Sequence, residues 1–228
     1  DASCDWSSDV CSSDLVTFDY MEKYLRGLIP DHQGMLKELE EYSIDNKVPI
    51  VQKETGRFLE LMVDLTKPKR ILELGTAIGY SSILMSVASK RNSKITTIER
   101  DKEMVEKATV NIHKYGFEDD IEILEGDCLE IIESIEDKFD IIFMDAGKGH
   151  YNHFLPHCLR LLNKDGIIIA DNVLFRGMVP SDELVKRRKI TIVKRMRTYL
   201  ELVSKDEELI TSVIPMGDGI AVTKRRGI

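Results

Sequence analysis

The sequence predicts a single α/β domain built on a mostly parallel, seven-stranded sheet with helices on both faces. Three observations carry this prediction. Short apolar runs alternate with helix-length amphipathic stretches, which is the pattern of consecutive strand–helix–strand units. The runs IIFMD and IIIAD are almost continuously apolar, as expected of central strands covered on both faces. The last two runs flank Gly217-Asp218-Gly219, which predicts a C-terminal antiparallel hairpin.

The region before the first strand has the apolar spacing of helices, with Pro30 and Pro49 as interruptions. Three apolar stripes are present: Tyr20, Tyr24 and Leu28; Met35, Leu36, Leu39 and Tyr42; and Phe58, Leu59, Met62 and Leu65. We therefore expect N-terminal helices ahead of the sheet.

The remaining elements follow in alternation along the chain. Strands are expected at 70–74, 95–98, 121–124, 139–144, 167–170, 209–214 and 220–224. Helices are expected at 81–88, 101–115, 129–135, 151–162 and, as one long helix, 183–202. No internal repeat or interdomain linker divides this series, so it predicts one domain over residues 15–228.

Composition and charge argue against several classes of protein. The net charge of −8, from 32 Lys and Arg against 40 Asp and Glu, argues against indiscriminate coating of nucleic acid but permits a local basic patch. No apolar run approaches the ~20 residues of a membrane span, and the four cysteines form no CxxC pair. We expect a cytoplasmic protein that does not enter a membrane. Residues 1–14, DASCDWSSDVCSSD, have no helix or strand period and are expected to be a non-native or disordered leader.

Candidate ligand-binding residues follow the first three strands, because ligands of open parallel sheets bind beyond the carboxyl ends of the strands. The first turn contains Gly75, Thr76, Gly79 and Ser81, with GxxxG spacing rather than the GxGxxG of dinucleotide sites. Glu99 ends the second strand and is suited to a ribose diol. The third strand ends in Gly126, Asp127 and Cys128, where adenine could be held. In this order, the three features predict an S-adenosylmethionine site.

A second constellation follows the fourth and fifth strands. Asp145, Asp171 and Asn172 are expected to meet at one sheet edge, and three hard oxygen ligands without Cys or His suit Mg²⁺. Helix N-capping by the two aspartates is the alternative. Lys148 lies beside them and is a candidate general base, or a group that only orients an oxyanion.

Seven cations lie within twelve residues that contain no acid. They are Lys186, Arg187, Arg188, Lys189, Lys194, Arg195 and Arg197. Such a run is either a solvated helix face or a site for phosphate groups, and both interpretations remain open.

Together, ELGTAIGYS, the acid of TIER, DAGKGHY and ADN resemble the cation-dependent class I O-methyltransferases, which include catechol and caffeoyl-CoA O-methyltransferases. The segments VPI, DNVLFRGMV and IPMGDGIAVTKR are similar to the bacterial branch of that family that methylates 5-hydroxyuridine at the tRNA wobble position, giving 5-methoxyuridine. The resemblance covers roughly residues 18–226. It implies a Rossmann-like class I methyltransferase fold.

The resemblance also implies roles for individual residues. Asp145, Asp171 and Asn172 would hold Mg²⁺, with Asp145 also serving the cofactor and catalysis, and Lys148 would occupy the position of the catalytic lysine. For the cofactor, S-adenosyl-L-methionine, Glu99 would bind the ribose. Ser81 and the Gly75–Gly79 turn would hold the methionine end. Asp127 and Cys128 would flank the adenine, and Val51 would line the site. Gly147 and Gly149 flank Lys148, and in this the sequence departs from the family's pattern.

The implied acceptor is the anticodon loop of tRNA, held by the basic run. The 5-hydroxyl and O4 of the base can chelate Mg²⁺ as a catechol does. Two alternatives remain, a small catechol-like phenol as acceptor and a non-catalytic module that binds the cofactor and RNA. Enzymes of this family are often homodimers, so we expect a homodimer.

Overall fold

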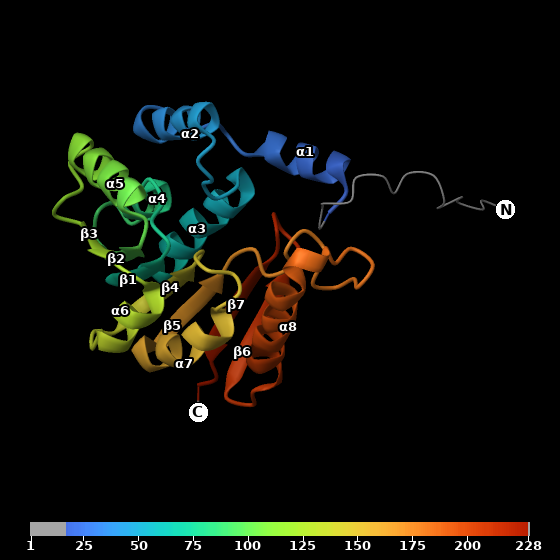
Figure 1. The fold of residues 1–228 in the computed structure, drawn as a ribbon. Helices are drawn as coiled ribbons and strands as arrows, with labels where there is room; N and C mark the ends of the chain where they lie inside the picture. Colours follow the sequence, from blue (N-terminus) through green and yellow to red (C-terminus); the bar gives the residue numbers. More distant parts are fainter. Residues whose placement is uncertain (1–16, 228) are drawn as a thin grey trace.

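The computed structural model describes residues 17–227, and the expected leader at residues 1–14 lies outside them. The seven strands form one sheet in the order β3-β2-β1-β4-β5-β7-β6 (Figure 1). Their bounds are β1 Arg70–Leu74, β2 Lys94–Glu99, β3 Ile121–Glu125, β4 Phe139–Met144, β5 Leu162–Ala170, β6 Leu209–Ile214 and β7 Ile220–Arg225. The strands from β1 to β5 pair in parallel, whereas β7 is antiparallel to both β5 and β6. The predicted mixed sheet with its C-terminal hairpin is confirmed.

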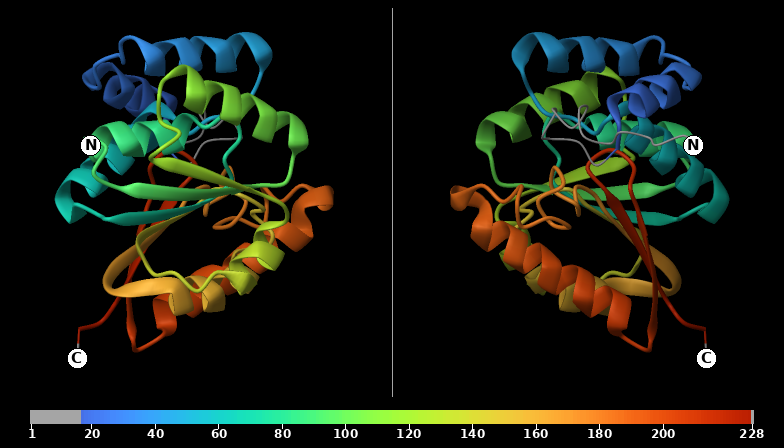
Figure 2. Two further views of the ribbon diagram at one scale, coloured as in Figure 1. Left: turned by 90° about the vertical axis from the view of Figure 1, so that its left-hand side faces the viewer. Right: turned by 90° about the vertical axis from the view of Figure 1, so that its right-hand side faces the viewer.

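Helices cover both faces of this sheet, so that the molecule has three layers (Figure 2). The α-helices are α1 Asp19–Leu28, α2 Met35–Asn46, α3 Lys53–Thr66, α4 Tyr80–Ala88, α5 Lys102–Lys114, α6 Cys128–Ser134, α7 Tyr151–Leu161 and α8 Ile190–Lys205. The helices from α1 to α5 lie on one side, and α6, α7 and α8 lie on the other. No helix within residues 17–227 is long and apolar enough to cross a membrane.

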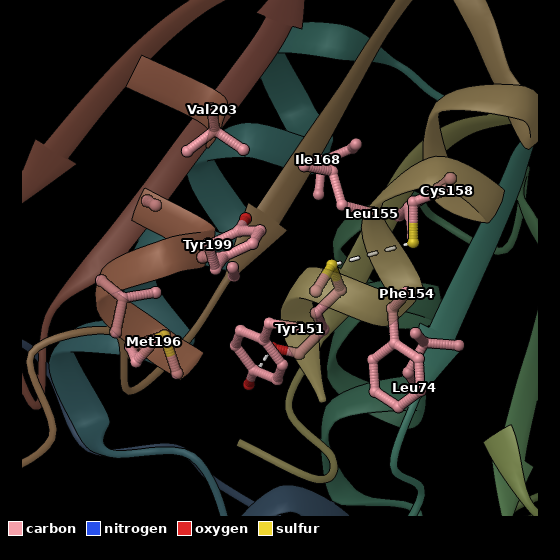
Figure 3. Packing of buried hydrophobic residues seen from close by; sticks show 14 of the residues in the cluster. Leu74, Tyr151, Phe154, Leu155, Cys158, Ile168, Met196, Tyr199 and Val203 are labelled. Carbon is pink, nitrogen blue, oxygen red and sulfur yellow. Dashed lines mark hydrogen bonds between the residues drawn. The ribbon is translucent and has the colours of Figure 1, made fainter. Parts of the chain in front are cut away.

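Two apolar cores follow from the alternation of side chains along the strands. On β1, Ile71 faces the core under α2 to α5, whereas Leu72 and Leu74 belong to the core under α6 to α8. In the second core, the buried rings of Tyr151 and Tyr199 meet edge to face, with centroids 5.5 Å apart (Figure 3). These two cores hold the strand ends rigidly on both sides, which fixes the loops that follow them.

The predicted long helix at 183–202 is wrong in its first part. The α-helix begins only at Ile190 and continues to Lys205, and Arg187–Lys189 form a separate 3₁₀ turn. Arg197 explains the difference, because its guanidinium donates to the carbonyl of Val179 at 2.8 Å and pairs with Asp182 at 2.7 Å. The segment before the basic run is thereby bound to the side of α8 and cannot extend the helix axis.

Strand order places the functional edge. The chain runs from β1 outward to β3, then crosses back to β4 beside β1 and continues outward to β5. The loops after β1 and β4 start side by side at the carboxyl ends of these strands and then lead in opposite directions along the sheet. Ligands of such sheets bind in the crevice at this point.

Candidate active site

A cavity of about 520 Å³ opens at the carboxyl edge of the sheet. Its wall is built by the turns after β1, β2, β4 and β5, by the β6–β7 hairpin, and by the segment between α2 and α3. Residues expected at the site that line it are Val51, Gly75, Glu99, Asp145, Lys148, Asp171 and Asn172. A smaller pocket of about 160 Å³ shares Gly75 and Glu99 with it and is lined by Asp127 and Cys128. The structure thus brings most of the predicted residues together.

The turn after β1 approaches the β4 loop closely. Gly75 has φ +104°, and a Cβ at this position would lie 3.0 Å from the Cβ of Ala146. Because glycine has no Cβ, its backbone itself lines the cavity here. Thr76 and Ser81 do not line the cavity, because both side chains are buried and Thr76 Oγ1 lies 2.6 Å from Thr97 Oγ1. They therefore lie beneath the turn.

Gly79 also lies away from the cavity wall, at the N-terminus of α4 with φ +83°. This backbone conformation favours glycine, and it lets the chain enter the helix directly after the turn. Gly79 therefore shapes the turn and does not contribute lining surface.

Glu99 is held rigidly by backbone donors. Its Oε2 accepts the N–H of Ala77 at 3.0 Å, and its Oε1 accepts those of Arg100 and Asp101, both at 2.9 Å. A carboxylate oxygen has two lone-pair positions, so Oε2 retains capacity for a further donor. Glu99 is therefore presented to the cavity as a fixed acceptor.

The turn after β3 shapes the smaller pocket. Asp127 caps α6 by accepting the N–H of Leu129 at 2.9 Å. Burial raises the pKa of the Cys128 thiol to about 12, so Cys128 is a neutral wall and no nucleophile. Gly126 does not line either pocket, but its N–H donates to the carbonyl of Glu99 at 2.8 Å and joins the two turns.

Asp145, Asp171, Asn172 and Lys148 form one connected group, as predicted. Asn172 Nδ2 donates to Asp145 Oδ1 at 2.9 Å, and the Lys148 ammonium donates to Asn172 Oδ1 at 2.5 Å. The N–H of Asn172 donates to Asp171 Oδ1 at 2.6 Å. Burial raises the pKa of both Asp145 and Asp171, and Lys148 opposes the rise in both. Repulsion adds to the effect of burial, from Glu73 at Asp145 and from Asp145 at Asp171.

This donor set fits a hard dication. Two buried carboxylates face a single lysine, so the negative charge is only partly compensated, and a dication would offset both desolvation and repulsion. Across residues 17–227, no group of three or more His, Cys, Asp or Glu side chains is arranged to hold a metal. The oxygen set of two carboxylates and one amide is of a different composition, and it suits Mg²⁺, which commonly keeps several waters.

Two residues that the sequence analysis did not assign also belong to the site. Asp218 lines the cavity from the tip of the β6–β7 hairpin, where the GDG turn had been interpreted only as a turn. Tyr151 is buried behind the acids, and its hydroxyl lies 2.9 Å from the carbonyl of Met144 and 3.0 Å from that of Asp171. Tyr151 ends the DAGKGHY segment, which was the available signal for it.

The basic run divides into two groups. Arg195 donates to the carbonyl of Gly149 at 3.1 Å, and Arg197 is bound to the 178–182 segment as described above. The side chains at 186–189 and Lys194 are exposed. The ammonium of Lys189 lies 5.9 Å from the ring centroid of Phe175, and that of Lys148 lies 6.0 Å from the same centroid. The exposed part of the run therefore adjoins the loop of residues 145–150, which carries Lys148 and is called the catalytic loop below.

Comparison with known proteins decides the family. Residues 29–226 match the sequence profile of a family described as O-methyltransferase. The chain belongs to this family. A caffeoyl-CoA O-methyltransferase of Populus kitakamiensis is 29% identical over 216 residues, which is 89% of this chain and 91% of the relative. A catechol O-methyltransferase of Niastella koreensis is 36% identical over 133 residues, which is 57% of this chain and 60% of the relative.

Solved structures of O-methyltransferase-like proteins share the fold over nearly the whole chain. A Staphylococcus aureus protein, provisionally assigned as a caffeoyl-CoA O-methyltransferase, superposes with a TM-score of 0.84 at 34% identity, covering 91% of this chain and all of that one (100%). The SAH-bound Podospora anserina methyltransferase PaMTH1 has a TM-score of 0.83 at 23% identity and covers 92% and 95% of the two chains. The predicted fold and O-methyltransferase family are confirmed.

Proposed function

We propose that this O-methyltransferase transfers a methyl group from S-adenosyl-L-methionine to the 5-hydroxyl of 5-hydroxyuridine at the tRNA wobble position, with Mg²⁺ as cofactor. The observation that carries the proposal is the connected group of Asp145, Asp171, Asn172 and Lys148, which shares one cavity with the Gly75 turn and Glu99. Methyl donor and acceptor can thus meet in a single cavity, and their alignment supplies much of the catalysis.

The cofactor half of the cavity lies over β1 and β2. Glu99 offers a fixed carboxylate to a ribose diol, the Gly75 turn offers backbone at close approach, and Val51 adds an apolar wall. The adjoining pocket at Asp127 and Cys128 has the place expected for adenine. The Podospora methyltransferase, which has the same fold, is SAH-bound, and SAH is the product that S-adenosyl-L-methionine leaves after methyl transfer, which supports this cofactor for the chain.

The acceptor chemistry rests on the residues over β4 and β5. Asp145, Asp171 and Asn172 would hold Mg²⁺, which when bound makes an acceptor hydroxyl easier to ionise. Lys148 lies within hydrogen-bond reach of Asn172 and is placed to take or orient the hydroxyl proton.

The choice of tRNA rests on charge beside the cavity. Arg187, Arg188 and Lys189 are exposed and adjoin the catalytic loop through Phe175, although the protein as a whole is acidic. Phosphates on either side of an unpaired wobble base would be held there while the base enters the cavity. The named relatives favour a catechol-like phenol as the second candidate, and that acceptor would leave the basic segment without a role.

Labelled S-adenosyl-L-methionine tests both candidates directly. Methyl transfer is measured to tRNA bearing 5-hydroxyuridine and to a simple catechol, each with and without EDTA. EDTA-sensitive labelling of tRNA with little labelling of catechol is the expected result. Labelling of catechol alone would move the substrate to a small phenol. Labelling of neither would favour a binding module without this chemistry.

Variants separate chemistry from tRNA binding. Asp145→Ala is expected to abolish turnover, whereas Arg187→Glu with Arg188→Glu is expected to raise the tRNA KM and leave kcat largely intact. Lys67→Glu with Lys90→Glu is the matched control, because these exposed lysines lie at the opposite, amino end of the strands. An equal loss of kcat alone in both site variants would contradict this division.

A homodimer is the proposed assembly, and a tRNA-modifying role would place it in the cytoplasm. Helix α1 buries none of its own residues, and Tyr20, Tyr24 and Leu28 are 70%, 67% and 62% exposed. A second copy that covers this face would remove a large apolar surface from water. Light scattering should give twice the monomer mass, and Tyr24→Asp should shift it toward the monomer. A wild-type protein that is monomeric at micromolar concentration would refute this assembly.

A further inference from the structure

The turn that follows β5 is held in an unusual backbone conformation. Asn172, Phe175 and Arg176 have φ values of +62°, +45° and +55°, although none of them is glycine. Left-handed backbone is uncommon for such residues and persists only where surrounding structure determines it. This turn carries Asn172 into the group with Asp145, and the side chain of Arg176 lines the same cavity.

The tip of the β6–β7 hairpin supplies the hydrogen bonds that determine this turn. The N–H of Val173 donates to the carbonyl of Gly219 at 2.9 Å, and that of Leu174 donates to the carbonyl of Asp218 at 3.0 Å. The carboxylate oxygen Oδ1 of Asp218 accepts the N–H of Arg176. The turn is therefore bonded to the hairpin at three successive points.

Close packing leaves the hairpin tip little freedom of its own. A Cβ at Gly219 would lie 2.4 Å from Cγ of Leu174, and one at Gly217 would lie 2.9 Å from Oε1 of Gln52. The hairpin tip is thus fitted between the turn on one side and the start of α3 on the other. Of the three hydrogen bonds between the hairpin tip and the turn, the one from Arg176 to Asp218 Oδ1 is accepted by a side chain and the other two by backbone carbonyls. The Asp218 bond can therefore be removed by substitution without rebuilding the backbone.

We propose that Asp218 is a positioning residue for methyl transfer, whose carboxylate oxygen fixes the 172–177 turn so that Asn172 and Arg176 face the acceptor. This inference rests on the proposed function, because the acceptor is expected over β4 and β5. Glu99 and the Gly75 turn lie over β2 and β1, on the far side of β4 from the hairpin. Loss of the Asp218 contact therefore affects the acceptor and spares the cofactor.

Arg176 gives the turn a chemical role beyond holding Asn172. Arg176 lines the cavity, and its guanidinium is near enough to Asp218 to attract that carboxylate. A guanidinium at this place suits an acceptor that carries carbonyl or phosphate oxygens. The backbone N–H bond from Arg176 to Asp218 sets the direction in which that side chain leaves the turn.

Two substitutions separate the possible roles of Asp218. Asp218→Ala removes the acceptor atom, whereas Asp218→Asn keeps one acceptor oxygen, removes the charge and replaces the second oxygen with an NH2 group. Ser212→Ala, at an exposed position on β6, is the matched control on the same hairpin. The protein is used as the full chain, and its folding is checked by circular dichroism in each variant.

Amide hydrogen exchange tests the contact without any turnover. Exchange at the Arg176 N–H, read by NMR, should accelerate about tenfold or more in Asp218→Ala, as expected for a lost charge-assisted hydrogen bond. The Asp218→Asn and Ser212→Ala variants should stay within about threefold of wild type, since a neutral oxygen still accepts. The Leu174 N–H, bonded to a backbone carbonyl, reports whether the hairpin itself remains in place. Unchanged exchange at Arg176 in Asp218→Ala would overturn the proposal.

Steady-state kinetics test whether the Asp218 contact affects methyl transfer. In Asp218→Ala, kcat/KM for the acceptor should fall about tenfold or more, while the S-adenosyl-L-methionine Kd by calorimetry stays within about twofold. Asp218→Asn should restore most of the lost kcat/KM. An Asp218→Asn variant as impaired as Asp218→Ala would assign the effect to charge and overturn the positioning role. If wild type methylates neither tRNA nor catechol, the proposed function fails, and exchange at Arg176 still decides whether Asp218 holds the turn.

Discussion

Glu73 offers a sharp prediction about the floor of the site, because it is a fully buried carboxyl without a basic partner. Its Oε2 accepts from Thr97 Oγ1 at 2.7 Å and from the hydroxyl of Ser82, whereas its Oε1 has no hydrogen-bond partner. Burial, followed by the nearby charge of Glu99, raises the pKa of Glu73, although the hydroxyl donors oppose the rise. The replacement Glu73→Gln keeps the shape and one acceptor oxygen but cannot ionise.

The raised pKa sets the sign of the pH dependence. The folded protein holds the Glu73 proton to a higher pH than the unfolded chain does. The stability contributed by this proton is fully present below the unfolded pKa and is lost as pH rises through the folded pKa. Glu73→Gln has no such loss, so its stability relative to wild type should improve as the pH rises.

The magnitude follows from linkage. Each unit by which the folded pKa exceeds the unfolded one removes about 1.4 kcal/mol of stability at high pH. For a chain of this length, about 1 kcal/mol shifts Tm by roughly 2–4 °C. The Tm of Glu73→Gln minus that of wild type should therefore increase between pH 5 and pH 8.5, by roughly 3–6 °C for each unit by which the folded pKa exceeds the unfolded one.

Thermal unfolding followed by circular dichroism measures this difference. The exposed Glu106→Gln serves as the matched control, and its Tm should track wild type at every pH. Parallel Tm curves for Glu73→Gln and wild type would refute the reasoning, since they would show that Glu73 has the same pKa in the folded and unfolded states.

Three further variants test the site. Tyr151→Phe removes the hydroxyl that contacts the carbonyls at the ends of β4 and β5, and should lower the free energy of unfolding in urea by about 1–2 kcal/mol; no change would show that the strand ends hold without it. Lys148→Met should lower the single-turnover rate by about 100-fold or more while calorimetric Mg²⁺ binding persists, and a rate near wild type would exclude Lys148 as base. Gly75→Ala places a Cβ against Ala146 at φ +104° and should weaken cofactor binding by about tenfold or more, so an unchanged Kd by calorimetry would contradict the close approach assigned to this turn.

The sheet could be predicted because its central strands are covered on both faces. An apolar run such as Ile141–Met144 has no polar face to present to water, and it is too short for a buried helix. A strand covered on both faces is therefore the element that it predicts. The start of β5 was missed for the converse reason, since Leu162–Gly166 carries the polar residues of an exposed strand end and has no apolar period. Alternation of residue types predicts strand centres better than it predicts their ends.

The candidate metal site could also be predicted, because it depends only on strand adjacency. Once β4 and β5 are neighbours in a parallel sheet, the residues after them must meet, and Asp145 and Asn172 are in contact. Asp218 could not be placed in this way. It reaches the cavity only because β7 pairs antiparallel with β5, which puts the hairpin tip at the carboxyl edge of a strand that runs in the opposite direction.

The basic run shows how one pattern can hold two kinds of residue. The sequence left two interpretations of the seven cations open, a solvated helix face and a phosphate site, and four cations in the early turns of a helix would oppose its macrodipole. The structure separates them accordingly. Arg195 and Arg197 lie on α8 and bind carbonyls of neighbouring loops, so that they position the catalytic loop and the 178–182 segment. Arg187, Arg188 and Lys189, just before α8, are exposed. A phosphate-binding role, if tRNA is the acceptor, therefore belongs to the 187–189 segment rather than to the helix, and charge reversal there should change the tRNA KM without loss of folding.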